Sequence, residues 1–400
     1  MRLQDSPAEE RFRKEVRTWL PEVVPTLPDK PAATDWAGRR AYDTGWQARL
    51  HEAGYAGINW PEAYGGVGAT PGEHLVFLEE SARAGAPDIG VNFVGLLHGG
   101  PTLIMEGSPE QRVEHLPRIL RGESVWCQGF SEPEAGSDLA SLRTRAVRDG
   151  DHYVVTGQKI WTSFANVADY CELLVRTDPE AGKHRGISWL IMPMDLPGIE
   201  VRPLRTAEGT AEFAELFLDE VRIPVANRVG DENDGWRVTQ VTLSFERGTA
   251  FVSEMLDAMR LVADLARVAR GTARPGGGTA WDDAGLRRDI GLVAADLDGL
   301  WALTKRNVTR AGRGTLSIAG GSAFKLYYAD VRHRLGDVAM RVLGRAGLSL
   351  ADLPGTPSAL GTGAHVHSEV HALAVSVAAG TSQIQRNILS ERVLGLPRER

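Results

Sequence analysis

The chain has 400 residues, 42% of them hydrophobic and 24% charged, a composition typical of a soluble globular protein with two or three packed units. Its formal net charge of −7 excludes long-range attraction to nucleic acid or to an anionic membrane. Only two cysteines occur, Cys127 and Cys171, without metal-ligand spacing, so a disulfide framework is excluded. The N-terminus fits neither a signal nor a transit peptide, and no apolar run is long enough for a membrane span, which predicts a cytoplasmic protein.

The first segment, residues 1–123, has a helical pattern. Phe12, Val16 and Leu20 recur at a spacing of four residues, which places them on one face of a helix. Turn residues interrupt the pattern at 59–73, and the glycines there lack the preceding strand of a dinucleotide fingerprint. A plain loop is therefore favoured at that point.

The middle segment, residues 124–230, changes to the period of β-strands. Short runs rich in branched and aromatic residues, such as QKIWTS and GISWLIMPM, are separated by Gly, Asp or Pro. The sequence Arg148-Asp149-Gly150-Asp151 is typical of a hairpin turn. We expect a compact central antiparallel β domain.

The last segment, residues 231–400, returns to long helices. Apolar residues from Val238 to Val262 predict one helix of about eight turns. Three further helical stretches follow near 284–310, 315–345 and 364–379, and Ser382 with Gln385 predicts a capping box for the last helix. The segment is expected to form a four-helix bundle, which makes the whole chain an α+β multidomain protein.

The stretch GFSEPEAGSD, residues 129–138, carries Glu132, Glu134 and Asp138. Three carboxylates in seven residues are compatible with a metal site or an acid–base pair, but no His or Cys lies close in the sequence to complete such a site. Pro133 and Gly136 indicate a tight, irregular backbone, so the stretch taken alone favours a surface loop that carries charged side chains. H-x-H-x3-H at His365, His367 and His371 is likewise better read as a helix-surface set than as a metal site, and no metal is expected.

GFSEPEAGSDLAS, together with WPEAYGG, YVVTGQKIWTS, VRIPVANRVG and GTSQIQRNILSERVLGLPR, resembles the recurring segments of the acyl-CoA dehydrogenase family over nearly the whole chain. The resemblance implies a helical domain, a central β domain and a C-terminal four-helix bundle, with FAD as cofactor. It places Gln128, Phe130, Ser131, Trp161, Ser163 and Thr381 at the flavin, and Ser137 and Arg247 at the thioester ligand. By the same resemblance, Glu132, Glu134 and Asp138 shape a turn or lie on the surface.

The reaction of this family needs a carboxylate at the substrate α-carbon. Most members place it directly before the Gly-Thr of the last loop, where this chain has Ala379. A minority branch supplies a Glu from the first bundle helix in a Glu-Arg pair, and here LSFERGTA places Glu246 and Arg247 there. The resemblance therefore identifies Glu246 as the α-proton acceptor, whereas a lone helical Glu beside Arg is otherwise an ordinary solvated pair.

The expected reaction is dehydrogenation of an acyl-CoA to trans-2-enoyl-CoA, with electrons passed to an electron-transfer flavoprotein. Two alternatives stay open: a flavin-dependent oxygenase or oxidase on the same fold, and a non-catalytic subunit of a heteromeric enzyme. The family's Arg-x-x-Phe-Gly segment for the flavin pyrophosphate is absent after residue 271, and Arg274, Arg341 and Arg345 are substitutes within a homotetramer. The other expectation is an α2β2 heterotetramer with a paralogous subunit, and the acyl group itself is not readable from the sequence.

Overall fold

A computed structural model describes residues 4–249, 251–311 and 318–397; the side chains of residues 244–249, 311, 318 and 319 lie outside the description. The chain divides into two compact units. The bundle unit comprises Met1–Arg17, Pro71–Ala84 and Phe251–Arg400, and the sheet unit comprises Thr18–Thr70 and Gly85–Ala250. The predicted order of helical, β and helical segments is confirmed, while the predicted boundaries near 123 and 230 stay predictions.

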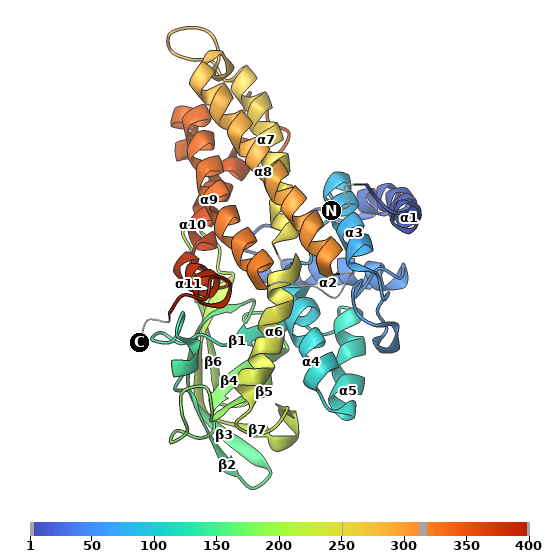
Figure 1. Ribbon diagram of the computed structural model, residues 1–400, viewed down its shortest axis with the longest axis vertical. Coiled ribbons are helices and arrows are strands. Elements are labelled where there is room, and N and C mark those ends of the chain that lie inside the picture. Colours follow the sequence, from blue (N-terminus) through green and yellow to red (C-terminus); the bar gives the residue numbers. More distant parts are fainter. Residues whose placement is uncertain (1–3, 250, 312–317, 398–400) are drawn as a thin grey trace. The chain divides into compact units, whose positions relative to one another are not determined.

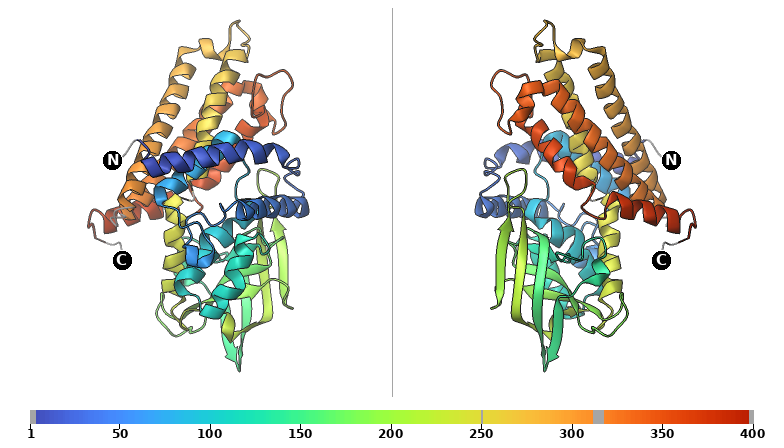
Figure 2. Two further views of the ribbon diagram at one scale, coloured as in Figure 1. Left: turned by 90° about the vertical axis from the view of Figure 1, so that its right-hand side faces the viewer. Right: turned by 90° about the vertical axis from the view of Figure 1, so that its left-hand side faces the viewer.

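The sheet unit is built around one sheet with eight strands in its described residues, in the order β6-β7-β3-β2-β4-β5-β8, with β1 paired to β4 (Figures 1 and 2). The strands are β1 (Trp126–Gly129), β2 (Arg145–Asp149), β3 (His152–Ser163), β4 (Tyr170–Arg176), β5 (Ile187–Pro193), β6 (Ile199–Leu204), β7 (Phe213–Pro224) and β8 (Arg228–Val229). Pairing of Asp149 with His152 leaves Gly150 and Asp151 as a two-residue turn, with Gly150 at a φ of +62°, so the predicted hairpin is confirmed. The sheet is mixed, because β4 runs parallel to both β1 and β2.

Helices of the sheet unit position the strands that carry the site. They are α2 (Trp36–Glu52), α4 (Gly100–Glu106), α5 (Pro109–Leu120) and α6 (Gly235–Thr249), with a π-helix at Gly95–Gly99 leading directly into α4. The π-helix packs closely on two tryptophans: a Cβ at Gly99 would lie 3.0 Å from Trp126 Cε3, and one at Gly100 would lie 2.1 Å from Trp60 Cζ2. A side chain at Gly100 would clash with Trp60 and one at Gly99 would press against Trp126 of β1, so the two glycines allow this helical segment to pack closely.

The bundle unit contains α3 (Pro71–Ala84), α7 (Val252–Gly271), α8 (Ala284–Ala311), α9 (Ile318–Leu343), α10 (Thr362–Val375) and α11 (Ser382–Arg392), while α1 (Pro7–Val23) begins in this unit. Its core includes Met255, Leu265, Leu297, Tyr328 and Val342, all fully or almost fully buried. The predicted bundle is confirmed, and none of the described helices is long and apolar enough to cross a lipid bilayer.

Two details of the C-terminal prediction are wrong. The single helix predicted from Val238 to Val262 is two helices, α6 and α7, consistent with the low helix propensity of Gly248 and Thr249. The N-cap of α11 is Thr381, whose hydroxyl accepts a hydrogen bond from the Ile384 amide at 3.2 Å, and not Ser382. The cap lies one residue earlier because Ser382 is already in the first turn of the helix.

Candidate active site

The carboxylate of Glu132 anchors the loop that follows β1. It accepts hydrogen bonds from the amides of Arg143 at 2.7 Å and Thr144 at 2.8 Å, and it pairs with Lys159 of β3 at 2.9 Å. Lys159 is 0% exposed and also donates to the Phe130 carbonyl at 3.1 Å. Because buried charges need both a counter-ion and hydrogen bonds, this pair fixes the backbone on either side of the loop.

The electrostatics of the pair follow from this burial. Desolvation opposes ionisation of Glu132, but Lys159 and the amide hydrogen bonds outweigh it, so the pKa of Glu132 lies below its ordinary value. Desolvation also lowers the pKa of Lys159, and the nearby Glu132 carboxylate counteracts part of that change. Glu132 is thus held as a structural anion, which makes it unsuited to accept a proton from a substrate.

The other two carboxylates of the loop are exposed. Glu134 pairs with Arg143 at 3.3 Å and Asp138 with Lys183 at 2.6 Å, and all four side chains are more than half exposed. Within the described residues no group of three or more His, Cys, Asp or Glu side chains could hold a metal ion. The three carboxylates of this loop therefore form neither a metal site nor an acid–base pair.

A strained, exposed tryptophan lies at the end of β3. Trp161 has a φ of +61°, a conformation that bulky residues rarely adopt, and its side chain is 59% exposed. It lies within an irregularity in the register of β3 against β7, and its ring contacts the edge of Phe213 at 5.9 Å between centroids. Such strain persists only where the surrounding structure enforces it, and it is concentrated at functional sites.

The end of β1 and the end of β3 come together at this point. The Ile160 amide donates to the Ser131 carbonyl at 3.0 Å, which places Ser131 beside the residue preceding Trp161. Phe130 is buried and Ser163 is half-buried. Among the described residues, none forms a hydrogen bond with the hydroxyl of Ser131 or of Ser163. Two available hydroxyls beside an exposed indole fit a planar, polar-edged ring such as a flavin.

The side chain of Gln128 belongs to a buried cluster of polar side chains. Its side-chain amide donates to Glu172 Oε1 of β4 at 2.8 Å and lies 3.0 Å from His98 Nδ1. His98 comes from the π-helix Gly95–Gly99, and both His98 and Glu172 are buried. Sequence reasoning missed both residues, although a Glu inside the apolar run CELLV and a His between glycines are signals of a buried polar cluster.

The remaining predicted site residues lie on other elements. Ser137 is exposed in the loop after β1, and Thr381 lies in the bundle unit as the cap of α11. Glu246 and Arg247 fall within α6, but their side chains lie outside the described residues. Ala379 occupies a left-handed conformation with a φ of +52°, and its carbonyl accepts a hydrogen bond from Gln385 at 3.3 Å.

His365 is buried in the bundle unit, which contradicts the expectation that it belongs to a helix-surface set. Its Nε2 lies 2.9 Å from the carboxylate of Asp264 on α7, and Asp264 also accepts from the Ser358 hydroxyl at 2.6 Å. Ser358 contacts the aspartate and not the histidine, so the three residues do not have the order of a nucleophilic triad. Their contacts join the segment before α10 to α7.

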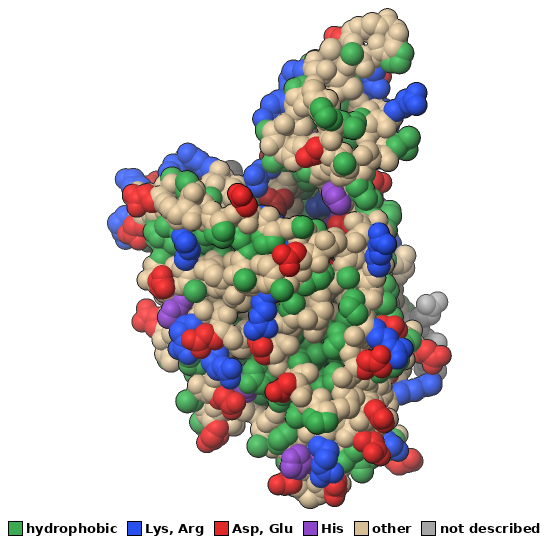
Figure 3. Space-filling model, turned by 180° about the vertical axis from the view of Figure 1, so that it is seen from behind, with side chains coloured by type: hydrophobic (Ala, Val, Ile, Leu, Met, Phe, Trp, Pro, Cys, Tyr) green, Lys and Arg blue, Asp and Glu red, His purple; other side chains and the backbone are tan. Residues whose placement is uncertain are grey.

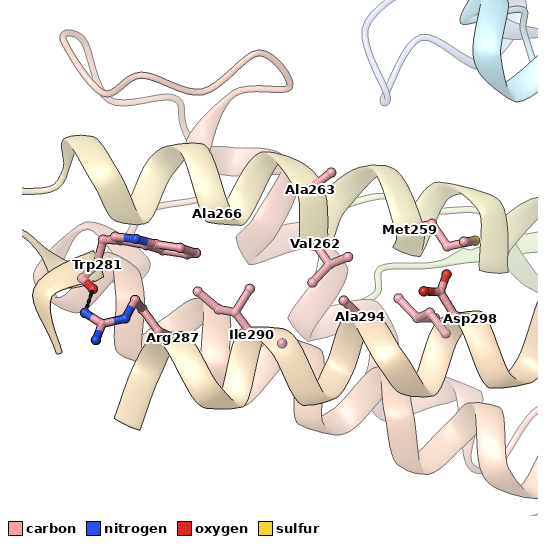
Figure 4. Close-up of a pocket in the computed structure, with 11 residues that line it drawn as sticks. Met259, Val262, Ala263, Ala266, Trp281, Arg287, Ile290, Ala294 and Asp298 are labelled. Atoms are coloured by element: carbon pink, nitrogen blue, oxygen red, sulfur yellow. Dashed lines mark hydrogen bonds between the residues drawn. The ribbon is translucent and has the colours of Figure 1, made fainter. Parts of the chain in front are cut away.

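A hollow of about 330 Å³ also lies in the bundle unit, between α7 and α8 (Figure 4). Val262 and Ile290 line its middle, and Arg287 donates to the Trp281 carbonyl at 2.6 Å at one end. None of the predicted site residues lines it, and its walls are largely apolar. On the face of the molecule in Figure 3, acidic and basic side chains are interspersed.

Comparison with known protein families covers most of the chain. Residues 6–123 match the acyl-CoA dehydrogenase N-terminal domain, residues 127–221 match the middle domain, and residues 233–394 match the C-terminal domain. The chain is 38% identical to acyl-CoA dehydrogenase IpdE1 of Mycobacterium tuberculosis, covering 98% of both chains. It is 36% identical to acyl-CoA dehydrogenase FadE26 of the same organism, covering 100% of this chain and 99% of the relative.

Solved structures agree with these relatives. A structure titled Tcur3481-Tcur3483 steroid ACAD matches with a TM-score of 0.86 and 32% identity over 100% of both chains. A chain of the ChsE4-ChsE5 complex from Mycobacterium tuberculosis matches with a TM-score of 0.84 and 34% identity, again over 100% of both chains. Both titles name two different proteins.

Proposed function

Because the chain belongs to the acyl-CoA dehydrogenase family, we propose that it catalyses FAD-dependent dehydrogenation of an acyl-CoA thioester to the trans-2-enoyl-CoA. The observation that carries this proposal is the group of residues at the ends of β1 and β3. There, an exposed Trp161 in a left-handed conformation lies beside the available hydroxyls of Ser131 and Ser163. An electron-transfer flavoprotein is the proposed electron acceptor.

The proposed cofactor fits these residues. Trp161, Ser163 and, from the segment directly after β1, Phe130 and Ser131 would hold the isoalloxazine, with the Ser163 hydroxyl available to hydrogen-bond it. Bound there, FAD supplies a two-electron acceptor for the hydride that leaves the substrate β-carbon. The buried pair of Glu132 and Lys159 keeps Phe130 and Ser131 in place for this contact.

Glu246 is the proposed acceptor of the α-proton. Ala379, at the position where most of the family carries the base, cannot accept a proton. The carboxylate on α6 takes the proton, and Arg247 and Ser137 bind the thioester ligand. A base on α6 argues against the non-catalytic alternative, because a subunit without catalysis needs no proton acceptor.

The test is anaerobic reduction of the flavin by acyl-CoA. We expect the wild-type protein to bleach and Glu246→Gln to retain flavin but bleach about 10²–10⁴-fold more slowly, because only the proton acceptor is removed. Glu254→Gln on α7, a carboxylate 3.4 Å from the Tyr328 hydroxyl, is the matched control and should keep the wild-type rate. Equal rates for wild type and Glu246→Gln would remove Glu246 from this role, and no bleaching of the wild type would favour the non-catalytic alternative.

The proposed acyl group is bulky, of the steroid side-chain class. This rests on the structural relative whose title names a steroid ACAD, at 32% identity over the whole chain. Turnover with a series of linear, branched and steroid side-chain CoA thioesters tests it. A preference for short linear thioesters would contradict the assignment.

The proposed assembly is an α2β2 heterotetramer. Of the candidate substitutes for Arg-x-x-Phe-Gly in a homotetramer, Arg341 pairs with Asp289 at 2.8 Å, and Arg274 donates to the Arg341 carbonyl at 2.8 Å. These contacts already use part of their donor capacity, which favours an arginine from a second chain for the flavin pyrophosphate. We expect this chain alone to be flavin-poor and to gain flavin when co-expressed with a paralogue that contains Arg-x-x-Phe-Gly. A flavin-replete, active homotetramer would overturn the proposal.

A further inference from the structure

Two residues in the left-handed conformation occur on either side of Ser163. Trp161 and Phe164 both have a φ of +61°, a backbone conformation that bulky side chains rarely adopt. Such strain persists only where the surroundings enforce it. Trp161 lies within an irregularity in the register of β3 against β7, whereas Phe164 lies directly beyond the last residue of β3. The contacts that enforce the conformation of Phe164 therefore help to determine where the neighbouring Ser163 side chain lies.

Phe164 is fixed both by its backbone and by its ring. Its amide donates to the Glu212 carbonyl at 2.8 Å, and its carbonyl accepts from the Val167 amide at 3.0 Å, which closes a turn. The side chain is buried and packs in a small core with Val91 and Val125. The residue thus has the backbone and side-chain contacts that a strained conformation needs in order to persist.

Helix α2 contacts this turn with one face. Trp36 and Arg40 are four residues apart, so they are neighbours on the same side of the helix. The ring of Trp36 packs against the same small core, with its centroid 6.2 Å from that of the Phe164 ring. Arg40 Nη1 donates to the Val167 carbonyl at the other end of the turn. The two side chains of α2 therefore hold both ends of the turn that begins at Phe164.

Arg40 also connects this turn with the segment before β1. Its Nη2 lies 2.8 and 3.0 Å from the two carboxylate oxygens of Asp169. Asp169 in turn accepts a hydrogen bond from the Val125 amide at 2.8 Å, and Val125 directly precedes β1. The segments that carry Ser131 and Ser163 are thus joined by one arginine, from a helix on which none of the predicted site residues lies.

We propose that Arg40 and Trp36 are positioning residues for the flavin: they hold Phe164 in its left-handed conformation and so keep the Ser163 hydroxyl where it can hydrogen-bond the isoalloxazine. The inference rests on the proposed function, because Ser163 is a proposed flavin contact. A hydrogen bond weakens steeply as its angle closes, so a small rotation of the chain at Ser163 is enough to weaken it. Neither residue of α2 needs to touch the flavin for this effect.

The test measures the midpoint potential of the flavin in the flavin-loaded protein, by reductive titration without acyl-CoA. Ser163→Ala defines the shift that follows from loss of the hydroxyl. We expect Arg40→Met to shift the potential in the same, more negative direction, because the hydrogen bond to the reduced ring is weakened, by a factor of about two to ten in the reduction equilibrium. Arg40→Lys, which keeps a cationic donor at this position, should recover part of the shift.

A double-variant cycle separates positioning from a general loosening of the structure. Because Arg40 acts through Ser163, Arg40→Met should add no further shift to that of Ser163→Ala. Trp36→Leu, which keeps an apolar side chain but loses the ring, should show the same dependence on Ser163. Arg49→Met is the matched control: Arg49 lies on the same helix and donates to the Thr26 hydroxyl at 2.7 Å, so its loss should leave the potential at the wild-type value. Shifts that add, or an Arg40→Met potential equal to that of the wild type, would overturn the proposal.

A second measurement needs no flavin. In the flavin-free protein, hydrogen exchange at the amides of Phe164 and Val167 reports how firmly the turn is held. We expect Arg40→Met to lower the protection of both amides and Arg49→Met to leave it unchanged; unaltered protection in Arg40→Met would refute the role of α2. If Arg40→Met fails to fold, Arg40→Lys and Trp36→Leu take its place in both measurements. A wild-type protein that no acyl-CoA reduces would instead refute the proposed function, and the flavin potentials would still report on Arg40.

Discussion

Replacing Lys159 by Met tests how the loop after β1 is held. The substitution keeps an unbranched side chain of similar length but leaves the Glu132 carboxylate buried without its cation. Removing one partner of a buried ion pair costs about 3–5 kcal/mol. At about 1.36 kcal/mol per factor of ten, that corresponds to about two to four orders of magnitude in a local opening equilibrium.

Hydrogen exchange at the amides of Arg143 and Thr144 measures the local opening equilibrium of the loop, because both amides donate hydrogen bonds to Glu132. We expect their protection to fall by about 10²–10⁴ in Lys159→Met, and flavin affinity to fall with it, since Lys159 also holds the Phe130 carbonyl.

The matched control is Lys183→Met, which breaks the exposed pair with Asp138 from the same loop. Exposed pairs contribute less than about 1 kcal/mol, so the protection of the same amides should change less than about fivefold. Equal losses in the two variants would refute the argument from burial. In the double variant Glu132→Gln with Lys159→Met, removal of the unpaired charge should recover part of the protection.

Three further outcomes are expected. Trp161→Gly should raise the free energy of unfolding of the flavin-free protein by up to about 1 kcal/mol in denaturant titration, because glycine adopts a positive φ without strain. The same substitution should weaken flavin binding in a fluorescence titration. A lower free energy of unfolding would argue against strain at this position. Ser163→Ala should make the flavin potential more negative and slow its reduction, because one hydrogen bond to the reduced ring is lost; an unchanged potential would show that Ser163 does not touch the ring. Burial lowers the pKa of His74 to about 4. As pH falls from about 6.5 to 4, His74 becomes protonated in the unfolded chain but not in the folded one. The free energy of unfolding of the bundle unit therefore falls over this range, by at most about 3 kcal/mol. His74→Leu should flatten thermal stability over that window, and an unaltered slope would contradict the assignment.

The sequence by itself determined the order of the segments and the family. The change from a spacing of four residues around Phe12, Val16 and Leu20 to alternating short strands is a local property, and so is the hairpin at Gly150. The family motif located the loop at residues 129–138 and the flavin-facing candidates Ser131, Trp161 and Ser163, whose mutual proximity the structure then showed in part.

Only the tertiary structure decided what the polar residues do. Glu132 and Lys159 are far apart in sequence, as are His98, Gln128 and Glu172, and they meet because β1 pairs with β4 in one register and the π-helix packs on β1. Local periodicity predicts where such residues lie on a strand or helix, but charged side chains are by default assigned to the surface. Strand register and helix packing determine their partners. Both depend on contacts between segments that are distant in the sequence, so no short stretch of sequence predicts them.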